Sequence, residues 1–300
     1  CRRDPHGGSR SKLPSSRFLT GADGDCLLRR TPAARASGPG PGARGLAASC
    51  ASGVATPGID PHDEEAVSDL IIALDLPSQA DALDLVDRLG ADADFYKVGL
   101  ELFSREGPGV ITELHDRGKR VFLDLKLMDI PNTVARAVAA ASDLGVELLT
   151  LHAHGGPRMM EAALGQAGPD TRLLAVTLLT SLSPDEIEVV WDRPVGSVRR
   201  EVLRLARLAR EAGMHGVVSS PLEAGELRTA LGPEALVVTP GVRLPGADHH
   251  DQNRVATPAA AVEAGASHLV VGRAVTLAAE PRAALEEVRA SMRAGVGSGG

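Results

Sequence analysis

Residues 122–133 read FLDLKLMDIPNT and place Asp124, Lys126 and Asp129 at the end of an apolar run. The run predicts a β-strand over residues 121–125, and side chains two positions apart on a strand share one face. Asp124 and Lys126 therefore share a face, and the neighbouring leucines take the other. Charges are costly on a strand that is covered on both sides, but an open rim tolerates them when they pair. Paired charges at a strand end also occur without a function, so the rest of the chain decides between these interpretations.

The alternation of a short apolar run with an amphipathic segment recurs from about residue 69 onward. Residues 133–144, after Pro131, and residues 198–212 show helical spacing, and Gly145 predicts the end of the first of these helices. The apolar runs that predict strands are 70–74, 95–98, 121–125, 148–151, 173–178, 216–219, 236–238 and 269–271. Eight strands alternating with eight helices over ~230 residues predict an α/β fold, a closed (β/α)8 TIM barrel. A doubly wound open sheet is the alternative, but no G-x-G-x-x-G follows the first strand.

The composition changes near residue 60 and divides the chain into three parts. Residues 1–62 are rich in Arg, Gly, Ala, Ser and Pro, so we expect a disordered low-complexity N-terminal tail. Residues 63–293 form the predicted barrel domain, and residues 294–300 form a flexible C-terminal tail. The Arg and Ser content of residues 1–62 is typical of a transit peptide, but this segment also contains acidic residues. A natural flexible extension, or a translation start assigned too far upstream, would explain the segment equally well.

The composition also excludes several classes of partner. All three cysteines (Cys1, Cys26 and Cys50) precede residue 60, so the predicted barrel has neither a disulfide nor a thiolate nucleophile. This distribution favours a reducing, cytoplasmic compartment. No apolar run reaches the ~18 residues that span a bilayer, so we expect no membrane span. A net charge of −7 and an aromatic content of 2% argue against nucleic acid as a partner.

A (β/α)8 barrel carries its functional groups at the C-terminal ends of its strands, with phosphate sites after the seventh and eighth. Glycines and polar residues lie at or after the C-terminal ends of the predicted strands: Asp75, Lys97, Gly99, Asp124, Lys126, Asp129, His152, His154, Thr180, Gly241, Arg243, Gly272 and Arg273. Arg243 and Arg273 are fork-shaped donors that suit a phosphate. Gly241 and Gly272 let the backbone approach a ligand closely. The sequence therefore predicts a site for a phosphorylated small molecule at this rim.

The acids around Lys126 indicate the chemistry of the rim. A Schiff-base lysine has to lose its proton easily, whereas the carboxylates of Asp124 and Asp129 favour the charged ammonium. We therefore expect Lys126 to donate a proton and to stabilise a carbanion. We expect Asp124 to stay ionised and to repel an anionic group of the substrate that departs.

A metal ion is the competing use of these carboxylates. Mg²⁺ prefers oxygen ligands, and Lys97 and Lys126 both oppose it at this rim. His152 and His154 suggest zinc, but neither a thiolate nor an H-x-x-x-H helix accompanies them. We therefore expect no metal, and we assign His152 to barrel packing or to a peripheral polar role.

Over roughly residues 69–290 the chain resembles the orotidine 5′-phosphate decarboxylase family. The motif Asp124-x-Lys126-x-x-Asp129-Ile-Pro-Asn-Thr133 is highly specific to that family. The other motifs that carry the resemblance are Ala-Leu-Asp75, Tyr96-Lys97-Val-Gly99, Leu179-Thr180-Ser181, Thr239-Pro-Gly-Val-Arg243, Asp251-Gln252-x-Arg254 and Val271-Gly272-Arg273. His154 stands where we expect a varied residue in the family, and the N-terminal tail has no counterpart in the family pattern.

The resemblance implies conversion of orotidine 5′-monophosphate to uridine 5′-monophosphate (UMP) and CO₂ in de novo pyrimidine biosynthesis, without cofactor or metal. It implies that Lys126 protonates C6 of the pyrimidine and that Asp124 lies against the departing carboxylate. Lys97 and Asp129 would complete a network of alternating charge, in a homodimer that contributes Asp129 and Thr133 across its interface. The remaining implied contacts are Asp75 and Lys97 to the ribose, Thr180 to the pyrimidine, and Arg243, Gln252, Gly272 and Arg273 at the phosphate.

Two alternatives stay open from the sequence. One is a Mg²⁺-dependent sugar-phosphate enzyme of the same superfamily, a 3-keto-gulonate-phosphate decarboxylase or a hexulose-phosphate synthase. Those relatives share Asp-x-Lys-x-x-Asp, but we expect them to carry a carboxylate where Lys97 stands and to lack Asp-Ile-Pro-Asn-Thr. The other is a catalytically silent barrel that binds UMP-like ligands, although such proteins usually lose a catalytic charge and this chain has all of them.

Overall fold

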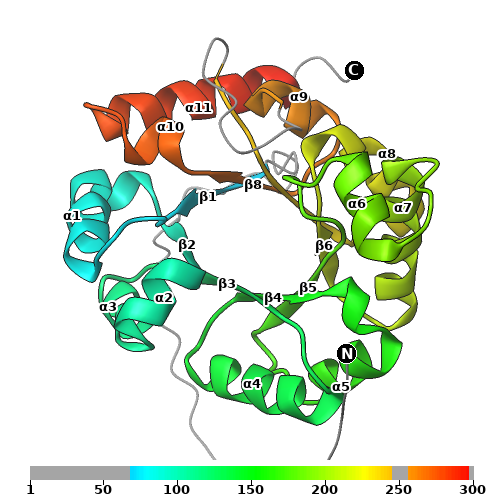
Figure 1. Cartoon of the computed structure of the whole chain (residues 1–300). Helices are drawn as coiled ribbons and strands as arrows, with labels where there is room; N and C mark the ends of the chain where they lie inside the picture. Colours follow the sequence, from blue (N-terminus) through cyan, green and yellow to red (C-terminus); the bar gives the residue numbers. More distant parts are fainter. Residues whose placement is uncertain (1–67, 245–255, 297–300) are drawn as a thin grey trace, which may run out of the picture. The chain divides into compact units, whose positions relative to one another are not determined.

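The computed structural model describes residues 68–244 and 256–296, and eight parallel strands close into a barrel in the order β1 to β8 (Figure 1). The strands are β1 Asp69–Ala73, β2 Phe95–Gly99, β3 Arg120–Leu127, β4 Leu148–His152, β5 Arg172–Val176, β6 Gly216–Val218, β7 Leu236–Pro240 and β8 His268–Val271. Each strand matches one predicted run, with ends that differ by at most two residues, and the barrel prediction is confirmed. The N-terminal tail of residues 1–62, the residues 297–300 and Gln252 lie outside the described residues.

Helices surround the barrel (Figure 1). The α-helices are α1 Gln79–Leu89, α2 Leu100–Glu106, α3 Gly109–Asp116, α4 Pro131–Asp143, α5 Pro157–Leu164, α6 Pro184–Trp191, α7 Val198–Glu211, α8 Ala224–Leu231, α9 Pro258–Glu263, α10 Arg273–Thr276 and α11 Pro281–Val296. Short 3-10 helices are η1 Gly90–Asp92, η2 Ala153–Gly155 and η3 Pro221–Glu223. Within the described chain β2, β5 and β8 are each followed by two α-helices, where the pattern predicted one. None of the described helices is both long and apolar enough to cross a bilayer.

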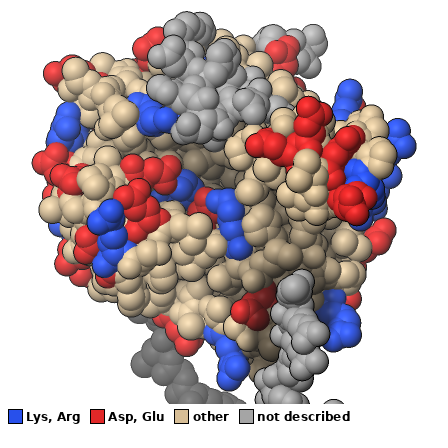
Figure 2. All heavy atoms as spheres, viewed as in Figure 1, with Lys and Arg blue, Asp and Glu red and all other residues tan. Residues whose placement is uncertain are grey.

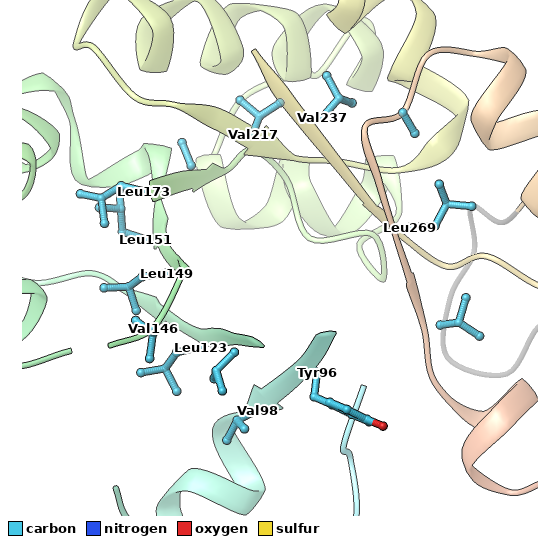
Figure 3. Close-up of a cluster of buried hydrophobic side chains, with 14 of the residues drawn as sticks. Tyr96, Val98, Leu123, Val146, Leu149, Leu151, Leu173, Val217, Val237 and Leu269 are labelled. Atoms are coloured by element: carbon cyan, nitrogen blue, oxygen red, sulfur yellow. The ribbon is translucent and has the colours of Figure 1, made fainter. Parts of the chain in front are cut away.

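Side chains on each strand alternate between the interior of the barrel and the surrounding helices. The buried residues of the interior are Ile71, Ala73, Phe95, Phe122, Leu148, Leu174, Val238 and Val270. The alternate positions form the larger core against the helices, and Tyr96, Leu123, Leu149, Val237 and Leu269 are among the residues that Figure 3 shows there. Because Phe95 and Phe122 point inward, Lys97 and Asp124, two residues further on, also point inward, at the C-terminal rim.

Arg120 closes the opposite, N-terminal end of the barrel. Its guanidinium donates to both carboxylate oxygens of Glu147 at 2.7 Å and to Asp69 at 3.0 Å, and it lies 4.1 Å from the centre of the Phe95 ring. The hydrogen bond to Glu147 is the main cause that raises the pKa of Arg120 above its ordinary value. Groups at this end of a (β/α)8 barrel contribute to stability, because the chemistry takes place at the other end.

Candidate active site

A cavity of about 540 Å³ opens at the C-terminal ends of the strands. Its volume lies within the range of small-molecule sites. The sequence-predicted residues that line it are Asp75, Lys97, Gly99, Asp124, Lys126, Thr180, Gly241, Arg243, Gly272 and Arg273. The space-filling view shows basic and acidic side chains together at the centre of the barrel face (Figure 2). The structure therefore brings together polar residues from the C-terminal ends of six strands (β1, β2, β3, β5, β7 and β8), as the barrel prediction requires.

Asp75, Lys97, Asp124 and Lys126 form a series of alternating charge in this cavity, which we name the charge chain. The Lys97 ammonium lies 2.8 Å from Oδ1 of Asp75 and 3.8 Å from Oδ2 of Asp124. The Lys126 ammonium lies 2.8 Å from both carboxylate oxygens of Asp124. The side chains of Lys97 and Asp124 are only 10% and 13% exposed, whereas Lys126 is 28% exposed. The two inner charges are thus buried and paired, and the Lys126 ammonium keeps an accessible side.

Gly99, at the end of β2, leaves the space that the first ion pair occupies. A Cβ at this position would lie 2.9 Å from Nζ of Lys97 and 3.0 Å from Oδ1 of Asp75. Such distances are shorter than ordinary van der Waals contact, so any side chain at position 99 would displace the pair.

Asp124 is ionised in this arrangement in spite of its burial. Burial raises the pKa of a carboxyl group, because a charge is less stable away from water. The cations Lys97 and Lys126, together with hydrogen bonds from Lys126 and Thr150, outweigh the burial and hold the pKa of Asp124 below its ordinary value. The cavity therefore presents a fixed negative charge beside an ammonium.

The chain reaches this geometry through an irregular strand, whereas the motif spacing suggested the shared face of a regular one. β3 pairs with β4 at Leu123 and Leu149 and again at Leu127 and Leu151, so β3 has three residues where β4 has one. Lys126 lies in this segment with φ of +52°, a left-handed conformation that is unfavourable for a residue with a side chain. Strained backbone of this kind is concentrated at functional sites.

Thr150 is the site residue that the sequence did not reveal. It is the single β4 residue opposite the irregular segment, and it is fully buried. Its hydroxyl accepts a hydrogen bond from the backbone N–H of Lys126 at 2.9 Å and donates one to Oδ1 of Asp124 at 2.9 Å. A threonine in an apolar strand gives no signal until the pairing of β3 with β4 is known.

Arg243 and Arg273 provide the positive part of the cavity that suits an anion. Burial, followed by the positive charge of Arg273, lowers the pKa of Arg243, so the two guanidinium groups lie close enough to repel each other. Nε of Arg243 is buried and has no hydrogen-bond partner among the described residues, while Nη1 donates to the carbonyl of Val242 at 2.9 Å. Two neighbouring cations and an unused buried donor are the groups that a phosphate would satisfy.

Asp129 and Thr133 do not reach the cavity of the same chain. Both are exposed at the start of α4, and Oδ1 of Asp129 accepts a hydrogen bond from the backbone N–H of Ile130 at 2.6 Å. In the described part of the chain no ion pair joins Asp129 to Lys126. Large apolar side chains flank Asp129, since Met128 is 57% and Ile130 67% exposed. The contribution of these residues from a second subunit stays a prediction.

His152 is the last residue of β4, and His154 lies in η2 directly after it, at the edge of the site. The ring of His154 lies 6.3 Å from that of His152 and 5.5 Å from that of Trp191. Burial, followed by the charges of His154 and Lys126, lowers the pKa of His152, so its imidazole is neutral at pH 7. Among residues 68–244 and 256–296, no group of three or more His, Cys, Asp and Glu side chains is arranged to hold a metal ion.

Known proteins match the chain over the whole described barrel. A family model for the orotidine 5′-phosphate decarboxylase / HUMPS family matches residues 68–288. The orotidine 5′-phosphate decarboxylase of Moorella thermoacetica is 47% identical over 233 residues, which cover 74% of this chain and 91% of that protein. The orotidine 5′-phosphate decarboxylase of Cutibacterium acnes is 49% identical over 231 residues, or 75% of this chain and 96% of that protein. The crystal structure of orotidine 5′-phosphate decarboxylase from Lactobacillus acidophilus superposes with a TM-score of 0.67 at 39% identity, and covers 75% of this chain and 99% of its own. The chain therefore belongs to the orotidine 5′-phosphate decarboxylase / HUMPS family.

Proposed function

We propose that this protein converts orotidine 5′-monophosphate to UMP and CO₂ in pyrimidine biosynthesis, without a cofactor or a metal ion. The observation that carries the proposal is the charge chain, which shares one cavity with Arg243 and Arg273. Relatives that are 47% to 51% identical and bear the name orotidine 5′-phosphate decarboxylase support the same reaction.

Asp124 and Lys126 carry the chemical step in this proposal. The bond between C6 and the carboxylate carbon breaks, its electron pair stays on C6 as a carbanion, and CO₂ departs. The ionised Asp124 repels the substrate carboxylate, and this repulsion ends when CO₂ leaves. The Lys126 ammonium stabilises the carbanion and donates a proton to C6. The neutral amine then takes a proton from water, which restores the enzyme.

The other predicted residues bind the parts of the nucleotide that do not react. Thr180 contacts the pyrimidine, Asp75 and Lys97 contact the ribose, and Arg243, Gln252, Gly272 and Arg273 hold the phosphate. Interactions with the remote phosphate lower the free-energy barrier of the reaction at the pyrimidine if they are stronger in the transition state than in the ground state. The buried Nε of Arg243 and the neighbouring Arg273 support the phosphate end of this assignment.

The proposal includes a homodimer in which Asp129 and Thr133 of one subunit complete the cavity of the other. Exposed apolar side chains beside a polar site are typical of a contact surface. Met128 and Ile130 flank Asp129, and Leu100, which is 55% exposed, lines the cavity itself. We also place the protein in the cytoplasm, which the confinement of its cysteines to the first 50 residues supports.

A Mg²⁺-dependent sugar-phosphate enzyme is the second candidate, because the matching family model also carries the HUMPS name. The position of Lys97 argues against it. The ammonium lies between the carboxylates of Asp75 and Asp124, at 2.8 Å and 3.8 Å, which is the place that a cation would take between two oxygen ligands.

The ultraviolet absorbance of orotidine 5′-monophosphate, followed with the full chain in excess EDTA, tests the proposal. We expect conversion to UMP that chelation does not slow. Absence of this conversion, together with turnover of a sugar phosphate that EDTA abolishes and Mg²⁺ restores, would support the sugar-phosphate candidate. Tight binding of UMP with no change in the substrate absorbance would support a silent nucleotide-binding barrel.

A further inference from the structure

The hydroxyl of Thr150 connects the two residues that carry the proposed chemistry. Thr150 lies in the middle of β4, is fully buried and follows the inward-facing Leu148 by two residues. Its Oγ lies 2.9 Å from the backbone nitrogen of Lys126 and 2.9 Å from Oδ1 of Asp124. It does not line the cavity, so its influence on a bound ligand passes through these two neighbours.

The direction of both hydrogen bonds is fixed by chemistry. A backbone N–H can only donate, so Thr150 accepts from Lys126. An ionised carboxylate can only accept, so the hydroxyl proton of Thr150 points at Asp124. The hydroxyl thus has one orientation, and a side chain without both an acceptor and a donor cannot replace it.

The irregular pairing of β3 with β4 explains why a side chain, and not a backbone carbonyl, accepts the hydrogen bond from the N–H of Lys126. Leu149 and Leu151 of β4 both pair with residues of β3. Between these two pairs β4 has only Thr150, whereas β3 has three residues, 124–126. A main-chain ladder cannot satisfy this surplus, and the N–H of Lys126 uses the threonine side chain in place of a carbonyl. Lys126 holds its left-handed φ of +52° next to this bond.

We propose that Thr150 is a positioning residue that holds the left-handed backbone of Lys126 and the carboxylate of Asp124 in the arrangement required for proton transfer. The proposal rests on the proposed function, since it assumes that these two residues act on the substrate. Without the hydroxyl, the backbone N–H of Lys126 loses its hydrogen-bond acceptor, and Oδ1 of Asp124 keeps only the Lys126 ammonium. The ammonium then has no fixed approach to the reacting carbon, and small misplacements of a catalytic group are costly.

Thr150→Val tests this role, because valine keeps the shape of threonine and removes the hydroxyl. We expect kcat to fall by about 30-fold or more, with KM and the affinity for UMP changed less than about threefold. Thr150→Ser keeps the hydroxyl and should stay within about fivefold of the wild-type kcat. Thr171→Val is the matched control, because Thr171 is also buried and donates to the carbonyl of Val146 at 2.8 Å, but at the N-terminal end of the barrel. This control should lower the melting temperature and leave kcat unchanged.

The dependence of kcat on pH separates positioning from a loss of stability. The groups that face Asp124 are Lys97 on β2, Lys126 on β3, and Thr150 and the neutral His152 on β4. Loss of the Thr150 hydrogen bond disfavours the ionised carboxylate, so the acid limb of the profile should move to higher pH in Thr150→Val. The profile of Thr171→Val should match the wild type.

A wild-type kcat retained by Thr150→Val, or an equal loss in Thr150→Val and Thr150→Ser, would overturn the proposal. If the valine variant does not fold, Thr150→Ala takes its place, and it must lose turnover that Thr150→Ser retains. A wild-type enzyme without activity on orotidine 5′-monophosphate would refute the proposed function instead. In that case the crystal structure of the valine variant decides: separation of the Lys126 and Asp124 side chains supports the positioning role, and an unchanged 2.8 Å contact refutes it.

Discussion

Nζ of Lys126 lies 2.8 Å from both carboxylate oxygens of Asp124, although the backbone between them does not follow a regular strand. The pair is held at one side by Lys97 and at the other by the Thr150 hydroxyl. Such fixed charges need no rearrangement when negative charge develops on a substrate carbon, which is how a preorganised site lowers a barrier.

Lys126→Ala should abolish measurable turnover and leave nucleotide binding largely intact. The ammonium is proposed to act on the carbanion, so its loss should lower kcat by about 10³-fold or more and change the affinity for UMP by less than about tenfold. Absorbance kinetics and calorimetric titration with UMP measure the two quantities. Near-wild-type turnover in this variant would refute proton donation by Lys126.

Arg273→Ala should weaken the phosphate site and spare the reaction of a substrate without phosphate. We expect kcat/KM for orotidine 5′-monophosphate to fall by about 10²-fold, because a charge-assisted contact to phosphate is lost. The slow turnover of the nucleoside orotidine should stay unchanged. Arg105→Ala is the control, since Arg105 lies on α2 with its side chain 58% exposed and pairs with Glu101. An equal loss with both substrates would place Arg273 outside the phosphate site.

Asp129 should act from the partner subunit. Lys126→Ala and Asp129→Ala should each be inactive alone, whereas a mixture refolded together contains heterodimers with one complete site. If the subunits pair at random, about one quarter of the wild-type activity should return. No recovery in a mixture shown to contain heterodimers would mean that Asp129 acts within its own chain or not at all.

Lys97→Ala should move the acid limb of the kcat profile to higher pH. Among the causes that lower the pKa of Asp124, the charge of Lys97 is the largest, so its removal raises this pKa. As the pH falls through the raised value, Asp124 becomes neutral and its repulsion of the substrate carboxylate is lost. We expect this shift in pH profiles that extend below 3.8, the ordinary pKa of the carboxyl group, so that the acid limb of the wild type is included. The lowered pKa of Asp124 also affects the stability of the wild-type fold. The ionised carboxylate stabilises the fold at pH values above 3.8, its ordinary pKa, and this stabilisation is lost as the pH falls through the lower pKa of the folded state. A profile identical to that of the wild type would contradict the coupling.

Arg120→Ala should destabilise the barrel without slowing the reaction. The variant loses the contacts to Glu147, Asp69 and the Phe95 ring at the N-terminal end. Since the Arg120 side chain is 34% exposed, we expect the free energy of unfolding to fall by about 1–3 kcal/mol, less than for a fully buried pair. Urea denaturation measures this change, and kcat should stay within about twofold of the wild type. A large fall in kcat with unchanged stability would contradict this assignment.

The sequence predicted the strands and the side of the barrel that holds the site, because both follow from local patterns. Apolar runs such as 95–98 coincide with β2, and the polar residues after them lie around one cavity. The predicted number of helices was wrong after β2, β5 and β8, where the structure has two helices in place of one. One helix of each pair is short: α2, α6 and α10 have only seven, eight and four residues. Such short segments complete too few turns for the helical period to show.

The local geometry of Lys126 could not be predicted from its motif. The spacing of Asp124 and Lys126 correctly predicts that their side chains lie together, but it assumes a regular strand. In the structure Lys126 has a left-handed backbone conformation instead. That conformation depends on Thr150, which is 24 residues from Lys126 in the chain and meets it only when β3 and β4 pair. Asp129 and Thr133 stay predictions for a different reason, since a single chain cannot show what a second one contributes.

The three-for-one register between β3 and β4 sets a condition for anyone who transplants this chemistry. An Asp-x-Lys pair grafted onto a straight strand of another (β/α)8 scaffold would lack the surplus residues and the left-handed turn that orient the ammonium. The smallest unit that could be transferred is therefore a two-strand fragment, with the hydroxyl on one strand and the carboxylate and the ammonium on its neighbour. Design protocols that copy only the charged residues would reproduce the charges and lose the geometry.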